Sequence, residues 1–410
     1  MTIPMYYDYP MVTECTARVL ETKQNGNSLI VRLDRSPLFP EGGGQLSDRC
    51  SIDDLSVSDV QIVNGDAWHY CSLGQNDGQA ELIEVGSLVT VRLDVETRLD
   101  RAEQHTGEHI LSGLASKLFS ACNVGFHMAE DYCTIDLDTF LTGEQLDKLE
   151  SAANAAVRAN LPIHTEVVSG EEASRRSLRK HADNIEGDVR IVYIGGGRVD
   201  SCTCCGTHLS STGMVGSVKI TDSQRYKGGT RLWFACGNRA VAAAAAMQNA
   251  MTALARKFST SREELPNAIA KQMNEITACK AEIKAKSALL AELYASKLIR
   301  ESEPVKGIRP IVAQLNGLNS IDSKLIGDRI CEMVPAVTLF FTFGTDGTNY
   351  RMACSNKSGM DMKQLCSAVN AAVNGKGGGS PMFAQGRTAE KVSEETIEML
   401  KNYIISVLRG

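Results

Sequence analysis

Two short motifs, far apart in the chain, place histidine and cysteine at spacings that suit a metal ion. His105 and His109 are four residues apart, so on a helix their rings lie one above the other on the same face. Cys204 and His208 have the same spacing. Three imidazoles and one thiolate form a ligand set suited to tetrahedral Zn²⁺. We therefore predict that these four side chains hold one Zn²⁺ per chain.

The same motifs have simpler interpretations. Two histidines at helical spacing are often ordinary surface or core residues, so the first motif alone is a weak signal. Cys202, Cys205 and His208 could instead hold a separate structural zinc. Glu108 directly precedes His109, unlike the glutamate of the metalloprotease His-Glu-x-x-His motif, and lies about 100° around the helix from it. We therefore expect Glu108 to be solvated or locally paired.

The composition is that of a soluble protein with about two or three domains, given 410 residues of which 43% are hydrophobic and 22% charged. No run approaches the roughly 18 apolar residues of a membrane span, and the first residues lack a secretory signal. We therefore expect a cytoplasmic protein with no membrane partner.

The net charge of −6 means that nucleic-acid binding would depend on local basic patches. Thirteen scattered cysteines, an odd number, favour reduced thiols over a disulfide framework.

The sequence around the two motifs predicts an α+β fold. Residues 1–92 alternate short apolar runs with turn signals, among them the hairpin signal Asn25-Gly26, and predict a small barrel or sandwich, of which we take a β-barrel as the prediction. From Thr97 the apolar residues recur every three or four positions. This period predicts a helix that carries the first histidine pair, within a mixed α/β zinc-containing domain over residues 93–240.

Two further segments complete the predicted fold. Residues 241–304 are mostly Ala, Lys, Glu, Leu and Met and predict a helical linker folded as a helical hairpin. The helix breaks near residue 260, either at a capping box of Ser261 and Glu264 or at Pro266 as the first residue of the second helix. Residues 305–410 combine strand-like runs with two helices, at 360–373 and 394–408, and predict an α/β C-terminal domain.

Several further segments carry a family pattern. They are residues 39–45 with Asp48 after them, then residues 105–111, 160–163, 190–192, 204–208, 231–234 and 375–381. With these segments the sequence resembles, over nearly its whole length, the editing and C-terminal domains of alanyl-tRNA synthetase and the free-standing AlaX alanyl-tRNA editing proteins. Cys205 and Ser380 depart from the family, which has glycine and arginine there.

The order of segments is similar to that of a long AlaX protein, whose C-terminal domain resembles the DHH-associated domain. An aminoacylation core would need several hundred more residues, so we expect no aminoacylation.

The resemblance implies a trans-editing hydrolase that deacylates mischarged alanine tRNA, carrying serine or, as a second candidate, glycine, by zinc-dependent ester hydrolysis. Such editing is needed because a site shaped for alanine rejects glycine or serine only about 10- to 200-fold. Zinc either activates water or positions the substrate, and the sequence leaves both roles open. The rival interpretations are a non-catalytic zinc-containing tRNA-binding protein and a metal-dependent nuclease.

The resemblance also suggests which residues serve the reaction. Gln45 and Thr106 are the catalytic candidates, through a contact with the serine hydroxyl that an alanyl ester lacks. The glycine run before Gln45 allows close backbone approach and offers N–H donors to the substrate, with a simple barrel turn as the alternative. We place the pocket between the barrel and the zinc-containing domain. The substrate-binding candidates are Gly42, Gly43, Gly44, Thr207 and Arg190.

Local basic residues predict where RNA binds. Arg175, Arg176, Arg179 and Lys180 form a cluster suited to acceptor-stem phosphates, and Lys376 lies beside glycines whose amides suit phosphate. As alternatives, the arginine cluster is an ordinary solvated face, and the segment at Lys376 is a structural loop. The partner implied by the resemblance is the acceptor end of alanine tRNA that carries serine or glycine. By the same resemblance, the C-terminal domain grips the tRNA body or forms a homodimer.

Overall fold

The computed structural model describes residues 2–7, 12–73, 83–180, 187–344, 347–355 and 358–410. The chain divides into two compact units, Met1–Leu254 and Ala255–Gly410, each described by itself below. Both units combine helices with sheets, which confirms the predicted α+β class. No helix in the described part of the chain is both long enough and apolar enough to cross a membrane.

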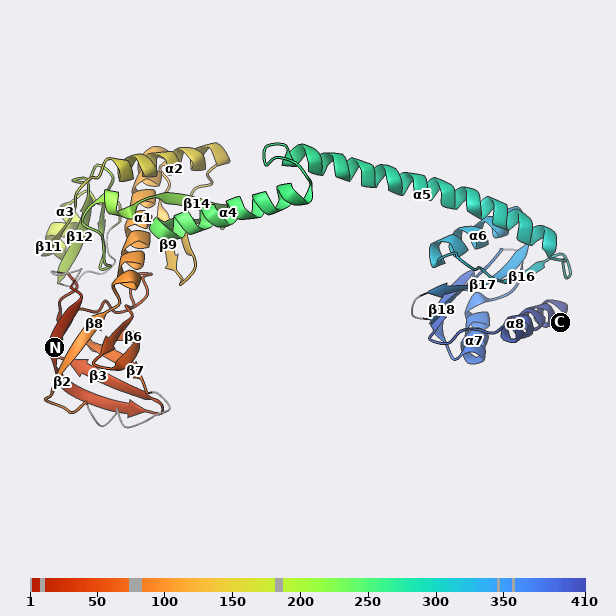
Figure 1. Cartoon of the computed structure of the whole chain (residues 1–410), viewed down its shortest axis with the longest axis horizontal. Helices are drawn as coiled ribbons and strands as arrows, with labels where there is room; N and C mark the ends of the chain where they lie inside the picture. Colours follow the sequence, from red (N-terminus) through yellow and green to blue (C-terminus); the bar gives the residue numbers. More distant parts are fainter. Residues whose placement is uncertain (1, 8–11, 74–82, 181–186, 345–346, 356–357) are drawn as a thin grey trace. The chain divides into compact units, whose positions relative to one another are not determined.

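The first unit begins with a closed six-stranded β-barrel, as predicted (Figure 1). Asn25 pairs with Ser28 at the end of the first hairpin, and Gly26 between them has a φ of 57°, a conformation that glycine adopts readily. Val31 and Leu33 are buried in the barrel core and alternate with the half-buried Ile30 and Arg32. In barrel order the strands are β2 (Glu14–Asn25), β3 (Ser28–Leu33), β7 (Asp66–Ser72), β6 (Leu55–Val63), β5 (Cys50–Ile52) and β8 (Leu88–Leu93); β1 (Ile3–Pro4) and β4 (Arg35–Ser36) pair in a separate sheet.

A histidine lies inside this barrel. His69 on β7 is fully buried, and its Nδ1 donates to the carbonyl oxygen of Val31 at 3.0 Å. Its Nε2 then accepts from the hydroxyl of Ser36 at 2.8 Å, which fixes the neutral tautomer. Burial lowers the pKa of His69 to about 4, although the bond to Val31 acts in the opposite direction.

We expect His69 to make the barrel sensitive to mild acid. Because its pKa is lower in the folded protein than the unfolded value of 6.5, the unfolded chain takes up a proton first. Stability is therefore lost as the pH falls from about 6.5 towards 4, by roughly 3 kcal/mol in full. Urea unfolding at pH 7 and at pH 4.5 measures this loss, which should be absent in His69→Gln. An equal pH dependence in both proteins would contradict the prediction.

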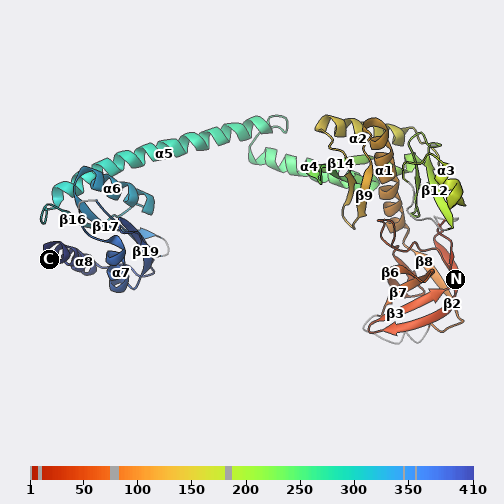
Figure 2. The same ribbon diagram turned by 180° about the vertical axis from the view of Figure 1, so that it is seen from behind.

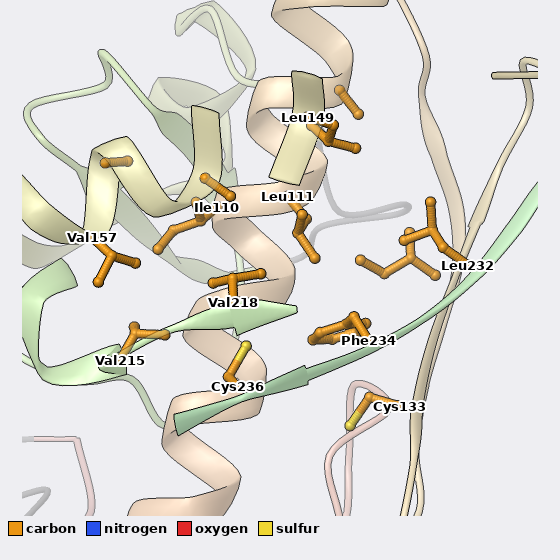
Figure 3. Close-up of a cluster of buried hydrophobic side chains, with 14 of the residues drawn as sticks. Ile110, Leu111, Cys133, Leu149, Val157, Val215, Val218, Leu232, Phe234 and Cys236 are labelled. Carbon is orange, nitrogen blue, oxygen red and sulfur yellow. The ribbon is translucent and has the colours of Figure 1, made fainter. Parts of the chain in front are cut away.

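The rest of the first unit packs two helices against a four-stranded sheet. Asp94 caps the long helix α1 (Val95–Phe119) by accepting from the Thr97 N–H. Ile110 and Leu111 of α1 belong to one buried core together with Leu149 of α2 and Phe234 of β15 (Figure 3). The sheet comprises β14 (Val218–Tyr226), β15 (Gly229–Cys236), β10 (Cys133–Leu137) and β9 (Asn123–Met128); the other elements are α2 (Gly143–Arg158), α3 (Gly170–Arg175), the 3-10 helix η2 (Thr212–Val215) and the sheet of β11 (Ile163–Ser169), β12 (Asp188–Ile194) and β13 (Asp200–Thr203).

A fully buried ion pair ties α1 to the barrel loop before β5. Arg98 on α1 donates from Nε to both carboxylate oxygens of Asp48, at 2.9 and 3.1 Å, and from Nη2 to the Pro37 carbonyl at 2.7 Å. Asp48 also accepts from the Phe39 N–H at 2.6 Å. The loop that carries the glycine run is therefore fixed on the helix that carries His105.

Two helices, α4 (Gly237–Lys257) and α5 (Leu265–Glu301), follow β15 and confirm the predicted break near residue 260. Pro266 is the second residue of α5, one position later than predicted. Ser261 accepts from the Glu264 N–H at 3.3 Å just before the helix, but no side chain caps α5 itself. The pairing of α4 and α5 as a hairpin stays a prediction.

The second unit is a five-stranded sheet with helices on both faces (Figure 2). Val337, Leu339 and Phe341 of the second strand pack with α7 and α8, while Ala336 and Phe340 pack with α5 and α6. This alternation places a core on each side of the sheet. The strands in order are β16 (Arg309–Gln314), β17 (Ala336–Gly344), β18 (Gly347–Cys354), β20 (Phe383–Thr388) and β19 (Lys376–Gly379), and the helices are α6 (Ser320–Met333), α7 (Met362–Val373) and α8 (Glu394–Arg409).

The glycine run that follows Lys376 forms a strand rather than a loop. A Cβ on Gly377 would lie 2.5 Å from the Gln385 carbonyl oxygen, and one on Gly379 would lie 2.1 Å from the Phe383 carbonyl oxygen. The glycines therefore let β19 approach β20 closely. Neither of these strands is predicted by sequence periodicity, because glycine is normally unfavourable in strands.

Candidate metal centre

The fold brings the two motifs together. His105 and His109 project from α1, while Cys204 and His208 lie between β13 and η2. One donor atom from each residue lies within 4.8 Å of all the others. Cys204 Sγ is 3.4 Å from Nε2 of both His105 and His208. Ligands at usual zinc distances on a tetrahedron have sulfur and nitrogen about 3.5 Å apart, so this donor set fits such an ion.

The three neighbouring cysteines differ in their surroundings, and Cys202 also lies with His109 and Asp200 in a second group that could hold a metal ion. Burial raises the pKa of Cys204, but its interactions with the nearby His105 and His208 outweigh burial and hold that pKa well below 9.0. Burial raises the pKa of Cys202 to about 11 and also raises that of Cys205. The thiolate form that binds metal is therefore favoured at Cys204. Among the described residues, the alternative group of Cys202, Cys205 and His208 is not close enough to share an ion, so that interpretation is wrong.

Gln45 lies behind His105, on the side of the ring that carries Nδ1. Its Oε1 accepts from His105 Nδ1 at 2.7 Å and from the Thr207 N–H at 3.1 Å, and its Nε2 donates to Thr207 Oγ1 at 2.8 Å. Both residues are almost fully buried. A histidine that donates from Nδ1 keeps the lone pair of Nε2 for a metal. The observed contacts therefore make Gln45 an orienting partner of His105, and its contact with a substrate stays a prediction.

Thr106 has a similar place behind His208. Its Oγ1 lies 3.5 Å from His208 Nδ1 and accepts from the Leu209 N–H at 3.2 Å. Thr106 is fully buried, while Cys204 is the one of the four ligand residues that is only partly buried. Among the four ligand residues, Cys204 is therefore the one with most access to solvent.

The glycine run forms the tight turn that presents Gln45. Gly42 and Gln45 exchange two backbone hydrogen bonds, at 3.0 and 3.1 Å. A Cβ on Gly44 would lie 2.8 Å from the ring of Phe126 on β9, whose ring centroid is 5.3 Å from that of His105. Gly43 and Gly44 both have positive φ. The turn therefore needs glycine for its packing against β9, and substrate binding by its amides stays a prediction.

Arg190 on β12 braces the loop of the second motif. Its Nη1 donates to the carbonyl oxygens of Cys204 and Gly206, each at 2.9 Å. Its guanidinium carbon lies 5.0 Å from the ring centroid of Tyr7. These contacts hold the backbone around Cys204, and the contact of Arg190 with a substrate stays a prediction.

Glu108 is the residue whose position sequence reasoning described least well. It is locally paired, as expected, because Oε1 accepts from Ser112 at 2.5 Å and from Asn123 Nδ2 at 2.6 Å. It is not solvated, because it is only 4% exposed. Its other oxygen, Oε2, lies 3.6 Å from His109 Nε2, the nitrogen that faces the cluster. Glu108 therefore borders the metal site, although its Cα lies around the helix from that of His109.

The predicted RNA-binding cluster after α3 divides into exposed and buried members. Arg175 is exposed and pairs with Glu171 at 2.5 Å, and Lys180 is also exposed. Arg176 lies between Glu166 and Glu172 and is bound to both. Arg179 differs, because its side chain is only 8% exposed. Only part of this cluster is therefore available to RNA.

Lys376 lines a polar cavity in the second unit. The cavity has a volume of about 400 Å³ and is lined by cationic side chains, hydroxyls and amides. Arg351 and Arg387 line it together with Lys376. A cavity with three cations suits a phosphate group better than an apolar ligand.

Two protein-family models match the chain. "Threonyl and Alanyl tRNA synthetase second additional domain" matches residues 189–232, which include Cys204 and His208, and "DHHA1 domain" matches residues 307–407. A solved structure, the C-Ala domain of alanyl-tRNA synthetase from Aquifex aeolicus, matches 27% of this chain and 98% of its own length at 16% identity, with a TM-score of 0.24.

Curated relatives match longer stretches. The alanyl-tRNA editing protein AlaX-L of Pyrococcus horikoshii is 27% identical over 98% of both chains. The alanine–tRNA ligase of Methanosarcina acetivorans is 28% identical over 93% of this chain, which spans only 42% of that ligase. The alanyl-tRNA editing protein Aarsd1 of Rattus norvegicus is 32% identical over 56% of this chain and 55% of its own length. With a full-length match to one editing protein and both domain types in place, the chain is an AlaX-L-like alanyl-tRNA editing protein homologue.

Proposed function

We propose that this protein hydrolyses the ester bond between serine or glycine and the terminal ribose of mischarged alanine tRNA. The observation that carries the proposal is the convergence of His105, His109, Cys204 and His208 into one buried cluster. The full-length similarity to a protein named as an alanyl-tRNA editing protein supports the substrate class. We further propose that the ion is Zn²⁺, which when bound would polarise the ester carbonyl or lower the pKa of a water molecule.

The residues around the cluster have separate tasks in this proposal. Gln45 and Thr106 hold the rings of His105 and His208 in orientation through their Nδ1 atoms. Glu108 offers the oxygen next to His109 Nε2 as a hydrogen-bond acceptor for a donor on the substrate, such as its α-ammonium group. The acylated ribose approaches from the side of Cys204, the least buried ligand.

The RNA is held by basic side chains outside the cluster. Arg175 and Lys180 are the exposed members of their segment, and both suit acceptor-stem phosphates. In the second unit, the cavity lined by Arg351, Lys376 and Arg387 suits a phosphate of the tRNA body. A homodimer through the C-terminal unit stays a prediction that light scattering tests.

The deciding experiment compares the serine, glycine and alanine esters of the same alanine tRNA, with and without a chelator. We expect release of serine and glycine, little release of alanine, intact tRNA, and loss of activity when the metal is removed. Retention of seryl-tRNA without release of serine would favour a non-catalytic tRNA-binding protein. Cleavage of the RNA itself would favour a nuclease.

A further inference from the structure

His109 is held from behind by two side chains in series. Its Nδ1 donates to Asp200 Oδ2 at 2.8 Å. Asp200 in turn accepts two hydrogen bonds from Arg179, from Nε to Oδ1 at 2.7 Å and from Nη2 to Oδ2 at 2.9 Å. Asp200 is 1% exposed, and the side chain of Arg179 is 8% exposed. Two donors of the guanidinium therefore bind the carboxylate behind the metal ligand. This two-bond geometry fixes both groups.

The backbone keeps this pair in place. Gly113 lies one helical turn after His109 on α1, and a Cβ there would lie 2.8 Å from the Cβ of Asp200 and 2.4 Å from the Val199 carbonyl oxygen. Asp200 can therefore reach His109 only because position 113 has no side chain. The Arg179 N–H donates to the Ser201 carbonyl oxygen at 2.8 Å, so the segment after α3 runs beside β13 and delivers Arg179 to Asp200.

We propose that Arg179, acting through Asp200, is a positioning residue for the metal ligand His109 and not an RNA-binding residue. The inference rests on the metal centre proposed above, but not on the identity of the substrate. A carboxylate behind a metal-bound histidine fixes the ring and its tautomer, and losing such a partner weakens metal binding by about 10- to 100-fold. Arg179 fixes the carboxylate in turn and compensates its buried charge.

The test compares Arg179→Met with Arg175→Met in the full-length protein. The second variant removes an equal charge from the same segment, but from an exposed pair with Glu171. Zinc affinity is measured by competition with a chromophoric chelator, and tRNA affinity is measured with uncharged alanine tRNA. We expect Arg179→Met to bind zinc about 10- to 100-fold more weakly with unchanged tRNA affinity, and Arg175→Met to keep wild-type zinc affinity.

Two conservative variants cover the case in which Arg179→Met does not fold. Arg179→Lys keeps the charge but loses the two-bond geometry, and Asp200→Asn keeps an acceptor for His109 but loses the charge. Both should bind zinc more weakly than the wild type.

Zinc affinity that is unchanged in the folded variants, or a loss confined to tRNA affinity, would overturn the inference. A wild-type protein that binds no zinc would overturn it together with the proposed metal centre, whereas zinc binding without deacylation would overturn only the proposed function.

Discussion

Replacing Cys204 by alanine should abolish both zinc binding and the deacylation of seryl-tRNA. Its sulfur lies 3.4 Å from Nε2 of both His105 and His208, so it is central to the donor set. A metal contributes several kcal/mol of transition-state stabilisation, and its loss should slow the reaction at least about a thousandfold. Single-turnover release of serine from seryl-tRNA, together with the zinc content of the purified variant, measures both effects.

The neighbouring thiol provides a matched control. Cys205 belongs to the same turn, but the residue as a whole is exposed; partial desolvation of its thiol, and then the charge of Cys204, raise its pKa. Cys205→Ala should therefore keep zinc content and deacylation rate close to those of the wild type. The ligand assignment would be wrong if Cys205→Ala lost its zinc while Cys204→Ala kept it.

Replacing Arg98 by methionine should lower the free energy of unfolding of the first unit by about 3 to 5 kcal/mol. The side chains of Arg98 and Asp48 are both fully buried, so the substitution leaves an unpaired carboxylate away from water. The released loop also carries Gln45, whose amide orients His105, so zinc affinity should fall as well. Urea unfolding at pH 7, followed by tryptophan fluorescence, measures the loss of stability.

Two further variants show whether the buried charge is responsible. Arg92→Met breaks a comparable contact, 3.0 Å from Nε to Glu14 Oε2, but that pair is exposed, so it should cost less than about 1 kcal/mol. Removing both buried charges in Arg98→Met with Asp48→Leu should restore part of the stability lost in Arg98→Met alone. Equal losses for Arg92→Met and Arg98→Met would contradict the argument.

The parts of the fold that depend on local signals could be predicted from the sequence. The hairpin at Asn25-Gly26 follows from turn chemistry, and α1 follows from an apolar period of three to four residues. The four ligand residues were found because two uncommon residue types recur at the same helical spacing. By contrast, α6 was missed because polar Asp322 and Ser323 lie on its buried face, which obscures the period.

The partners of the metal ligands could not be predicted because their contacts span the chain. Gln45 and His105 lie 60 residues apart, and Asp200 and His109 lie 91 apart. Glutamine and aspartate are common residue types, and nothing in their immediate sequence marks them as partners of histidine. Arg179 was grouped with exposed arginines because only the course of the backbone beside β13 shows that it turns inward.

The cluster draws its parts from elements made at different times during synthesis. Gln45 comes from the barrel and His105 from the helix after it, while His208 follows a separate sheet. A nascent chain therefore cannot assemble the complete site until residue 208 has left the ribosome. The barrel, α1 and the segment after β13 must also have packed together. If the cluster binds Zn²⁺ as proposed, uptake of the ion is consequently a late event, and a bound ion would report that His105, His109, Cys204 and His208 have come together.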